Sequence, residues 1–178
     1  MANKAQRVFE SIRLNCPESV FRRVTEDIDE LSDTLTPAAQ KRIIRELLTR
    51  LEAECGSDAC ARVMRPCGYN CLSARIINEG RKKWLQAAGD IPAFLLSLNE
   101  SGIGGGNMRL ENGSIIAEYS RCCCGLVKNG GVPSVYCECS AGWFEKFFSE
   151  VFGHPVFVRL RRSILAGAHE CTFQIDIT

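Results

Sequence analysis

The chain has 178 residues and a formal net charge of +1, with 46% hydrophobic and 24% charged residues. This length suits one compact domain, with two small domains less favoured, and the hydrophobic content is high enough for a core, which excludes wholesale disorder. The balanced charge and the short basic clusters argue against nucleic acid as a main partner. No apolar run approaches the ~18 residues of a membrane span, and the N-terminal segment is amphipathic rather than a signal core. We therefore expect a cytoplasmic protein with no membrane partner.

The cysteine content is the unusual feature of this composition. There are eleven cysteines, an odd number, and a reducing cytoplasm keeps thiols from forming lasting disulfides. Metal ligands or reactive thiols are therefore favoured over structural disulfides. The question is which cysteines come together and what they hold.

The N-terminal part of the chain has apolar residues at helical spacing. The pattern begins over residues 9–31. Thr36 is the predicted N-cap of the next helix, with Pro37 in its first turn, and Gly56 is predicted to end that helix. We expect a helical turn or two within residues 57–67, one helix over residues 71–88 and another over residues 91–99.

The pattern changes at the glycine-rich residues 101–106. These residues predict a loop, and because they follow a helix and lack a trailing Gly-Lys-Ser/Thr, a flexible connector is favoured over a phosphate-binding loop. Two short strands are predicted next, over residues 108–110 and 114–119. They flank Asn112-Gly113, the strongest short signal for a hairpin turn.

The rest of the chain predicts an aromatic helix over residues 141–152 and a second hairpin. The hairpin is indicated by apolar and polar residues that alternate over residues 156–161 and 171–178. The order of helices, hairpin, helix and hairpin predicts an α+β fold in which an antiparallel sheet packs one face against helices. We expect a single domain, 1–178, with a helical part, 1–105, and an α+β part, 106–178.

The C-terminal part contains two Cys-x-Cys pairs and a later cysteine. Side chains two residues apart on extended backbone point to the same side, so each pair would present two sulfurs. Zinc takes four ligands of this kind in a tetrahedron, and we predict a zinc site here. The predicted zinc ligands of this group are Cys122, Cys124, Cys137, Cys139 and Cys171.

One member of this group, Cys139, has a second interpretation. Ser140 is the predicted N-cap of the aromatic helix, and a helix dipole favours a thiolate at its N-terminal end. Cys139 would then be a reactive thiol with a lowered pKa. Cys16 and Cys123 are assigned to packing, because free cysteines are common small core residues.

A second cysteine group lies in the helical part, where packing and function are equally open. Arg62 and Arg65 in the same stretch suit thiolate stabilisation or the binding of an anion. One interpretation of this cysteine group is a second metal site or a redox pair. An iron–sulfur cluster is less favoured, because the short-gap run that ends in Cys-Pro is missing. This group consists of Cys55, Cys60, Cys67 and Cys71.

The last third of the chain resembles the 4-vinyl-reductase-type domain. The resemblance rests on residues 137–143 (CECSAGW), 148–156 (FSEVFGHPV) and 163–173 (SILAGAHECTF). It implies a ligand-binding fold shared with nitric-oxide-sensor haem domains and with small subunits of a vesicle-tethering complex. Members of the family bind small hydrophobic molecules, for example aromatic effectors, so the resemblance implies a small-molecule ligand.

The resemblance also implies a zinc ion beside the pocket. The family's ligands fall on Glu118, Cys137 and Cys171, and the fourth falls on Ser163, which is a poor zinc ligand. One of Cys122, Cys124 and Cys139 would then complete a relocated tetrahedron. The cysteine pattern looks like a cysteine-rich bacterial and archaeal branch of this group. A branch similar to aminothiazoline-carboxylate hydrolase shares the C-terminal motifs, but this chain has no arrangement for that activity beyond a thiolate or a metal-bound water.

Two functional hypotheses follow from these observations. The first is a sensory or accessory domain that binds a small, hydrophobic molecule and carries a cysteine-ligated structural zinc. Its pocket would lie between the sheet and the aromatic helix, lined by Trp143, Phe144 and Phe147. The alternative is a metal- or thiolate-dependent enzyme, a hydrolase or a redox protein, that uses one cysteine cluster. A purely structural partner protein and a homodimer are left open.

Overall fold

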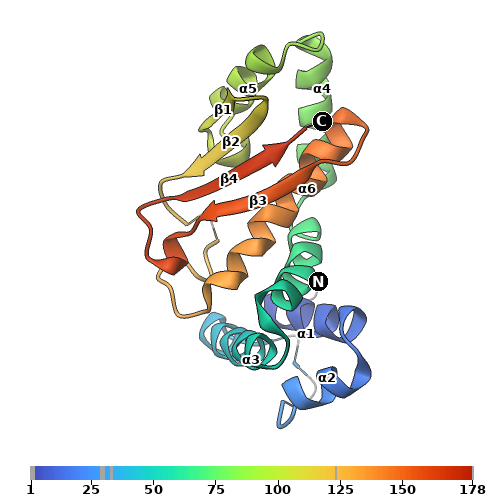
Figure 1. The fold of residues 1–178 in the computed structure, drawn as a ribbon, viewed down its shortest axis with the longest axis vertical. Coiled ribbons are helices and arrows are strands. Elements are labelled where there is room, and N and C mark those ends of the chain that lie inside the picture. The colour runs from blue at the N-terminus through green and yellow to red at the C-terminus, as the bar shows by residue number, and fades with distance from the viewer. Residues whose placement is uncertain (1–2, 29–30, 33, 123, 178) are drawn as a thin grey trace.

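The computed structural model describes residues 3–28, 31–32, 34–122 and 124–177. Within these ranges the predicted α+β fold is confirmed, with helices and one four-stranded antiparallel sheet (Figure 1). The main elements are α1 (Lys4–Asn15), α2 (Glu18–Val24), α3 (Pro37–Tyr69), α4 (Ala74–Gln86), α5 (Ile91–Glu100), β1 (Met108–Glu111), β2 (Ser114–Tyr119), α6 (Glu138–Phe152), β3 (Phe157–Arg162) and β4 (Cys171–Asp176). The short 3₁₀ helices are η1 (Ile103–Gly105), η2 (Ser134–Cys137) and η3 (Ile164–Ala166).

Pro17 divides the helical pattern at the N-terminus into two helices. Helix α1 begins with a capping box, in which Asn3 and Gln6 each bind the other's backbone amide. It ends at Asn15, and α2 begins after Pro17, whose missing N–H and fixed φ suit the start of a helix. Lys4 is therefore held in the first turn of α1.

Helix α3 starts as predicted and runs further than predicted. The Thr36 hydroxyl accepts a hydrogen bond from the amide of Ala39 at 3.2 Å, and Pro37 follows it. Gly56 was expected to end the helix, but it only kinks it (φ 78°, ψ 173°), and the chain re-enters the helix and continues to Tyr69. Glycine adopts this positive φ at no steric cost, which allows a kink without a loop.

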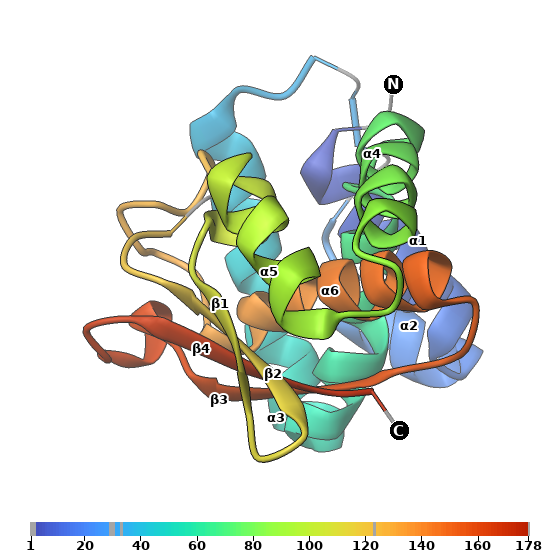
Figure 2. The same ribbon diagram turned by 90° about the horizontal axis from the view of Figure 1, so that it is seen from above.

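The sheet has the strand order β1-β2-β4-β3, and both predicted hairpins are confirmed. Asn112 and Gly113 both have positive φ, as the tight hairpin turn requires. The side chains on one face of the sheet, such as Ile115 and Ile175, are fully buried. Helices α5 and α6 lie on that face (Figure 2).

The described residues form two hydrophobic clusters. One lies between the sheet and helices α4, α5 and α6, and the other lies among α1, α2, α3 and the segment before α6. Phe94 of the helical part belongs to the first cluster, and Val127 and Tyr136 of the later part belong to the second. The two clusters therefore do not divide at residue 105.

Helices α3 and α6 join the two clusters by crossing in backbone contact. A β-carbon at Gly68 would collide with the carbonyl oxygen of Cys139, and one at Gly142 would collide with the backbone of Arg65. Only glycine permits this approach at both positions. The crossing brings the end of α3 against the first turn of α6.

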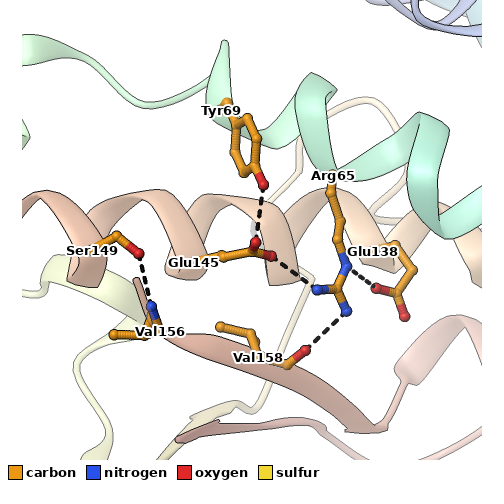
Figure 3. A network of polar contacts seen from close by, with 7 residues as sticks. All are labelled: Arg65, Tyr69, Glu138, Glu145, Ser149, Val156 and Val158. Carbon is orange, nitrogen blue, oxygen red and sulfur yellow. Dashed lines mark hydrogen bonds and ion pairs between the residues drawn. The ribbon is translucent and has the colours of Figure 1, made fainter. Parts of the chain in front are cut away.

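Arg65 fixes this crossing to the sheet (Figure 3). Its guanidinium contacts Glu138 at 3.1 Å and Glu145 at 2.9 Å on α6, and donates to the carbonyl oxygen of Val158 on β3 at 2.9 Å. The Tyr69 hydroxyl donates to Glu145 at 3.1 Å. Arg65 was expected to stabilise thiolates or bind an anion, but it pairs with carboxylates of α6 instead.

Within the described residues, no helix is both long enough and apolar enough to cross a bilayer.

Candidate functional site

The two cysteines at the start of α6 point in different directions. Extended backbone was expected here, with Ser140 as the helix N-cap, but η2 leads directly into α6, which begins at Glu138 with Cys137 as its N-cap. Side chains two positions apart on a helix point in directions that differ by a rotation of roughly 200°. The predicted alignment of Cys137 with Cys139 is therefore wrong, and each thiol pairs with a different partner.

A cavity of about 790 Å³ lies on the Cys139 side of this helix start. Segments from across the chain form its wall: the first turn of α1, the turn after α3, the glycine-rich loop, the end of β2, η2 and α6. The lining residues are Lys4, Cys71, Gly102, Gly104, Gly105, Tyr119, Ser120, Arg121, Cys124, Tyr136, Cys139, Ser140 and Trp143.

The glycine-rich loop forms a packed part of the cavity wall. The sequence predicts only a flexible connector at residues 101–106. Gly104 and Gly105 have positive φ of 66° and 92°. A β-carbon at Gly104 would lie 3.1 Å from the side chain of Phe144, and one at Gly105 would collide with the Tyr119 ring. The loop can approach the cavity because it has no side chains there.

Cys71 and Cys139 form a thiol pair on the cavity wall. Cys71 is exposed and Cys139 is partly buried. A hydrogen bond from Cys139 lowers the pKa of Cys71 to about 6, and the charges of Arg7 and Lys4 add to this effect. The contact with Cys71, together with burial, raises the pKa of Cys139. The pair thus keeps one proton on Cys139, and the thiolate expected at Cys139 lies at Cys71.

Lys4 connects this pair to a third thiol. Its ammonium donates to Cys124 Sγ at 3.0 Å, and Tyr136 Oη lies 3.6 Å from the same sulfur. Burial raises the pKa of Cys124, but the hydrogen bonds from Lys4 and Tyr136 outweigh burial, so the pKa is lowered. Burial raises the pKa of Tyr136, which makes its hydroxyl the donor. A second sulfur with a lowered pKa therefore faces the cavity.

The remaining wall is aromatic and basic. Trp143 stacks on Phe147 with ring centroids 5.2 Å apart, and Tyr119 stacks on Phe144 at 5.7 Å. Of the three residues predicted to line a pocket, Trp143 does so, whereas Phe144 and Phe147 are fully buried behind the wall. The described lining residues include Lys4 and Arg121 but neither Asp nor Glu.

Cys137 and Cys171 form a second thiol pair on the other side of α6. Cys137 Sγ lies 3.0 Å from Ser163 Oγ, and the amide of Ile164 donates to Cys171 Sγ at 3.3 Å. The contact with Cys137 lowers the pKa of Cys171 to about 6, while the same contact and burial raise the pKa of Cys137. Both residues are buried, at 7% and 4% exposure, and neither lines the 790 Å³ cavity.

Glu118 does not join this second pair, which corrects the zinc site implied by the resemblance. In the β2–β4 register Glu118 lies beside Thr172, and it is Tyr119 that lies beside Cys171. Successive side chains of a strand point to opposite faces, so Glu118 faces away from Cys171. Its carboxylate binds Arg109 at 2.8 Å and Asn107 at 2.9 Å. The set of Glu118, Cys137, Cys171 and Ser163 does not fit one zinc ion.

The five predicted zinc-binding cysteines are also divided between two places. Cys124 and Cys139 face the cavity, whereas Cys137 and Cys171 pair on the other side of α6. Cys122 is close enough to Cys137 to raise its pKa. In the part of the chain that the structure describes, no group of three or more His, Cys, Asp or Glu side chains is arranged to hold a metal ion. Cys123 lies outside the described residues.

The four cysteines of the helical part do not form one cluster. Cys55 is exposed, and Cys60 is buried, with its pKa raised to about 12 by burial. Cys67 is buried behind the cavity pair, and burial raises its pKa to about 11. Only Cys71 of this group reaches the cavity wall.

No pattern in the sequence indicated Lys4 or Tyr136 as site residues, or the pairing of Cys71 with Cys139. Cys71 and Cys139 were assigned to different groups because they are far apart in the chain.

Residues 1–178 match the model of a family described as "Family of unknown function (DUF6144)". A comparison with curated proteins finds no match.

Proposed function

The chain belongs to the DUF6144 family, whose function is unknown, and we propose its function from the cavity: it binds a small anionic molecule with an aromatic or apolar part. The observation that carries this proposal is the position of Lys4, whose side chain lines a wall that has neither Asp nor Glu among its described residues. Trp143 and Tyr119 offer the aromatic surface. Pockets of this kind combine apolar walls with a few polar groups that fix orientation.

Lys4 is the residue on which the anion preference rests most directly. Burial lowers the pKa of Lys4, but the hydrogen bond to Cys124 and the charges of Cys124 and Cys71 raise it above its ordinary value. A cation held in this way stays charged at neutral pH. An anionic group on a ligand can share it, and such charge-assisted hydrogen bonds are worth about 1.5–3 kcal/mol.

A second candidate function, a thiolate-dependent enzyme, is favoured by the position of Cys71. Cys71 is an exposed residue that lines the cavity, and the pKa of its thiol is lowered to about 6. The thiolate is the nucleophilic form of cysteine, and an accessible one beside cations is the usual setting of a reactive thiol. The enzyme and the binding protein use the same cavity, so they differ in whether the bound molecule is altered.

The zinc site and the cytoplasmic location of the protein both stay predictions. Each thiol pair supplies two sulfurs, so a tetrahedral zinc site would need two further donors. Metal analysis of the purified protein tests this: about one zinc per chain supports the site, whereas zinc-free, colourless protein contradicts both zinc and an iron–sulfur cluster.

The ten cysteines that the structure describes are free thiols. A reducing compartment maintains this state, which supports the cytoplasm.

The binding proposal is tested with anilinonaphthalene sulfonate, an anionic aromatic probe. The sequence has two tryptophans, so Trp84→Phe leaves Trp143 as the only donor for energy transfer to bound probe. We expect saturable binding with energy transfer from Trp143. Lys4→Met removes the charge while keeping the side-chain length, and we expect it to weaken binding about tenfold.

The matched control is Lys128→Met, which removes the same charge from an exposed residue outside the cavity wall. It should leave probe affinity unchanged. Binding without energy transfer from Trp143, or equal weakening by Lys4→Met and Lys128→Met, contradicts the proposed site.

A further inference from the structure

Two thiols from distant parts of the chain are in hydrogen-bonding contact at the cavity wall. Cys71 lies in the turn between α3 and α4, and Cys139 lies in the first turn of α6. The glycine crossing of α3 and α6 and the Arg65 contacts hold both segments in place. We propose that Cys71 and Cys139 are a redox-active dithiol that exchanges with a small anionic disulfide bound in the cavity.

The inference rests on the proposed function to the extent that the disulfide is the anion that the cavity binds. Both thiols line the same cavity and share a hydrogen bond, so a small shift of the two segments brings the sulfurs to bonding distance. The exposed Cys71 is the one that an incoming molecule reaches first, and the partly buried Cys139 lies behind it. This is the order of an attacking and a resolving thiol.

The chemistry balances as two successive exchanges. The Cys71 thiolate attacks one sulfur of the disulfide, the S–S bond breaks, and one small thiolate leaves while Cys71 carries the other half. The Cys139 proton passes to the leaving thiolate. Cys139 then attacks the Cys71 sulfur and releases the second half, which takes a proton from water. The small disulfide gains two electrons and the pair loses two. A second dithiol, or two small thiols, returns the pair to its reduced form.

The Cys137–Cys171 pair is an internal reference for this inference. Its thiols are in the same kind of contact, and one of them also has a pKa of about 6. Both side chains are buried, however, and lie outside the cavity wall. If contact between thiols were sufficient, both pairs would oxidise in the folded protein. If access from the cavity matters, only Cys71 and Cys139 react.

The experiment treats the reduced, full-length protein with glutathione disulfide, which carries carboxylates. After alkylation of the remaining thiols, peptide mass spectrometry identifies the products. We expect a disulfide between Cys71 and Cys139, with Cys137 and Cys171 alkylated only after unfolding. Cys139→Ser should accumulate a glutathione adduct at Cys71, because the resolving thiol is gone. Cys71→Ser should form no adduct at Cys139.

Cys55 is the control for ordinary thiol reactivity, because it is exposed and does not line the cavity. Cys55 should form a mixed disulfide with glutathione and react no further. Glutathione adducts at Cys55 with both thiols of the pair intact would overturn the inference. So would an oxidised Cys137–Cys171 pair beside a reduced Cys71–Cys139 pair. Cys139→Ala replaces Cys139→Ser if near-ultraviolet circular dichroism shows that the serine variant does not fold.

Two further measurements separate this inference from the proposed function. The wild-type protein is titrated with anilinonaphthalene sulfonate: saturable probe binding together with an unreactive Cys71–Cys139 pair means that the cavity binds anions and the redox inference fails. Cystamine, a cationic disulfide, is compared with glutathione disulfide. Equal rates of Cys71–Cys139 oxidation by the two reagents would support the dithiol but overturn its preference for an anionic substrate.

Discussion

Gly68 lies with its α-carbon against the carbonyl group of Cys139, so that any β-carbon at residue 68 would overlap that oxygen. Cys139 belongs to the first turn of α6, and Gly68 is followed within one turn by Cys71. The contact between two backbones thus sets the separation of the two sulfurs at the cavity. The position of the site depends on this helix crossing rather than on any local motif.

We therefore expect Gly68→Ala to destabilise the protein and to separate Cys71 from Cys139. The added methyl group meets backbone atoms that have no alternative rotamer, so α3 and α6 must move apart, at a cost of about 2–3 kcal/mol in unfolding free energy. Urea denaturation measures the loss. Gly125→Ala is the control, because a β-carbon there meets nothing within 4 Å, and its effect should stay within about 0.5 kcal/mol. Equal stability of the two variants would show that the crossing is looser than described.

A second prediction concerns Arg65, which holds Glu138 and Glu145 at one guanidinium (Figure 3). Arg65→Met leaves both carboxylates without this partner where their side chains are only 17% and 26% exposed. We expect a loss of about 2 kcal/mol in unfolding free energy, measured by urea denaturation.

The control for Arg65 is Arg22→Met, which removes an ion pair on the surface of α2, where Arg22 is 77% exposed. Exposed pairs contribute little, so its effect should stay below about 0.5 kcal/mol. If Arg65→Met cost no more than Arg22→Met, the Arg65 contacts would be no more than surface pairs, and another interaction would have to fix α6 to β3.

The features predictable from the sequence are those that depend on near neighbours. Thr36 and Pro37 define a helix start because the capping hydroxyl and the fixed φ act within one turn. Asn112 and Gly113 define a hairpin because the turn needs two residues that accept positive φ. The α+β fold followed from placing these local signals in chain order.

The arrangement of the thiols was not predictable in the same way, because it depends on backbone state and on tertiary contact. Cys137 and Cys139 were expected to share a direction on extended backbone, and a helical start sends them to opposite sides. The helix resumes after Gly56, which carries Cys71 to the crossing. No spacing along the chain relates Cys71 to Cys139, since the glycines of two separate helices bring them together.

A third prediction concerns the glycine-rich wall of the cavity. Gly105→Ala and Gly102→Ala both place a β-carbon on backbone with positive φ, which costs about 1–2 kcal/mol for any L-residue. Only the Gly105 methyl collides with the Tyr119 ring, whereas the Gly102 methyl meets nothing within 4 Å. Tyr119 is backed by Phe144 and Phe173, so the ring has to move toward the cavity.

Gly105→Ala should therefore lose about 1–3 kcal/mol more in unfolding free energy than Gly102→Ala. It should also weaken the binding of anilinonaphthalene sulfonate, which Gly102→Ala should leave nearly unchanged. Fluorescence titration of both variants compares two positions that both have a positive φ. The same probe affinity in both variants would mean that Tyr119 does not border the space that the probe occupies.

The fourth prediction is the pH dependence of alkylation at Cys71. Its pKa is about 6, and only the thiolate reacts with iodoacetamide. Above this pKa the residue is already ionised and its alkylation rate is on a plateau. Below it the thiol is protonated, and the rate falls about tenfold for each further unit of pH. Peptide mass spectrometry follows the adduct at Cys71 in the folded protein.

Variants of the groups that stabilise the thiolate test its cause. Cys139→Ala removes the largest contribution and should move the midpoint of the rate profile furthest toward higher pH, with Arg7→Met moving it less, by roughly 0.5–1 unit. Arg13→Met takes the same charge from an exposed position on the same helix, where Arg13 pairs with Glu10, and should not move it. An equal shift from Arg7→Met and Arg13→Met would mean that the general charge of α1, and not the contact with Arg7, acts on Cys71.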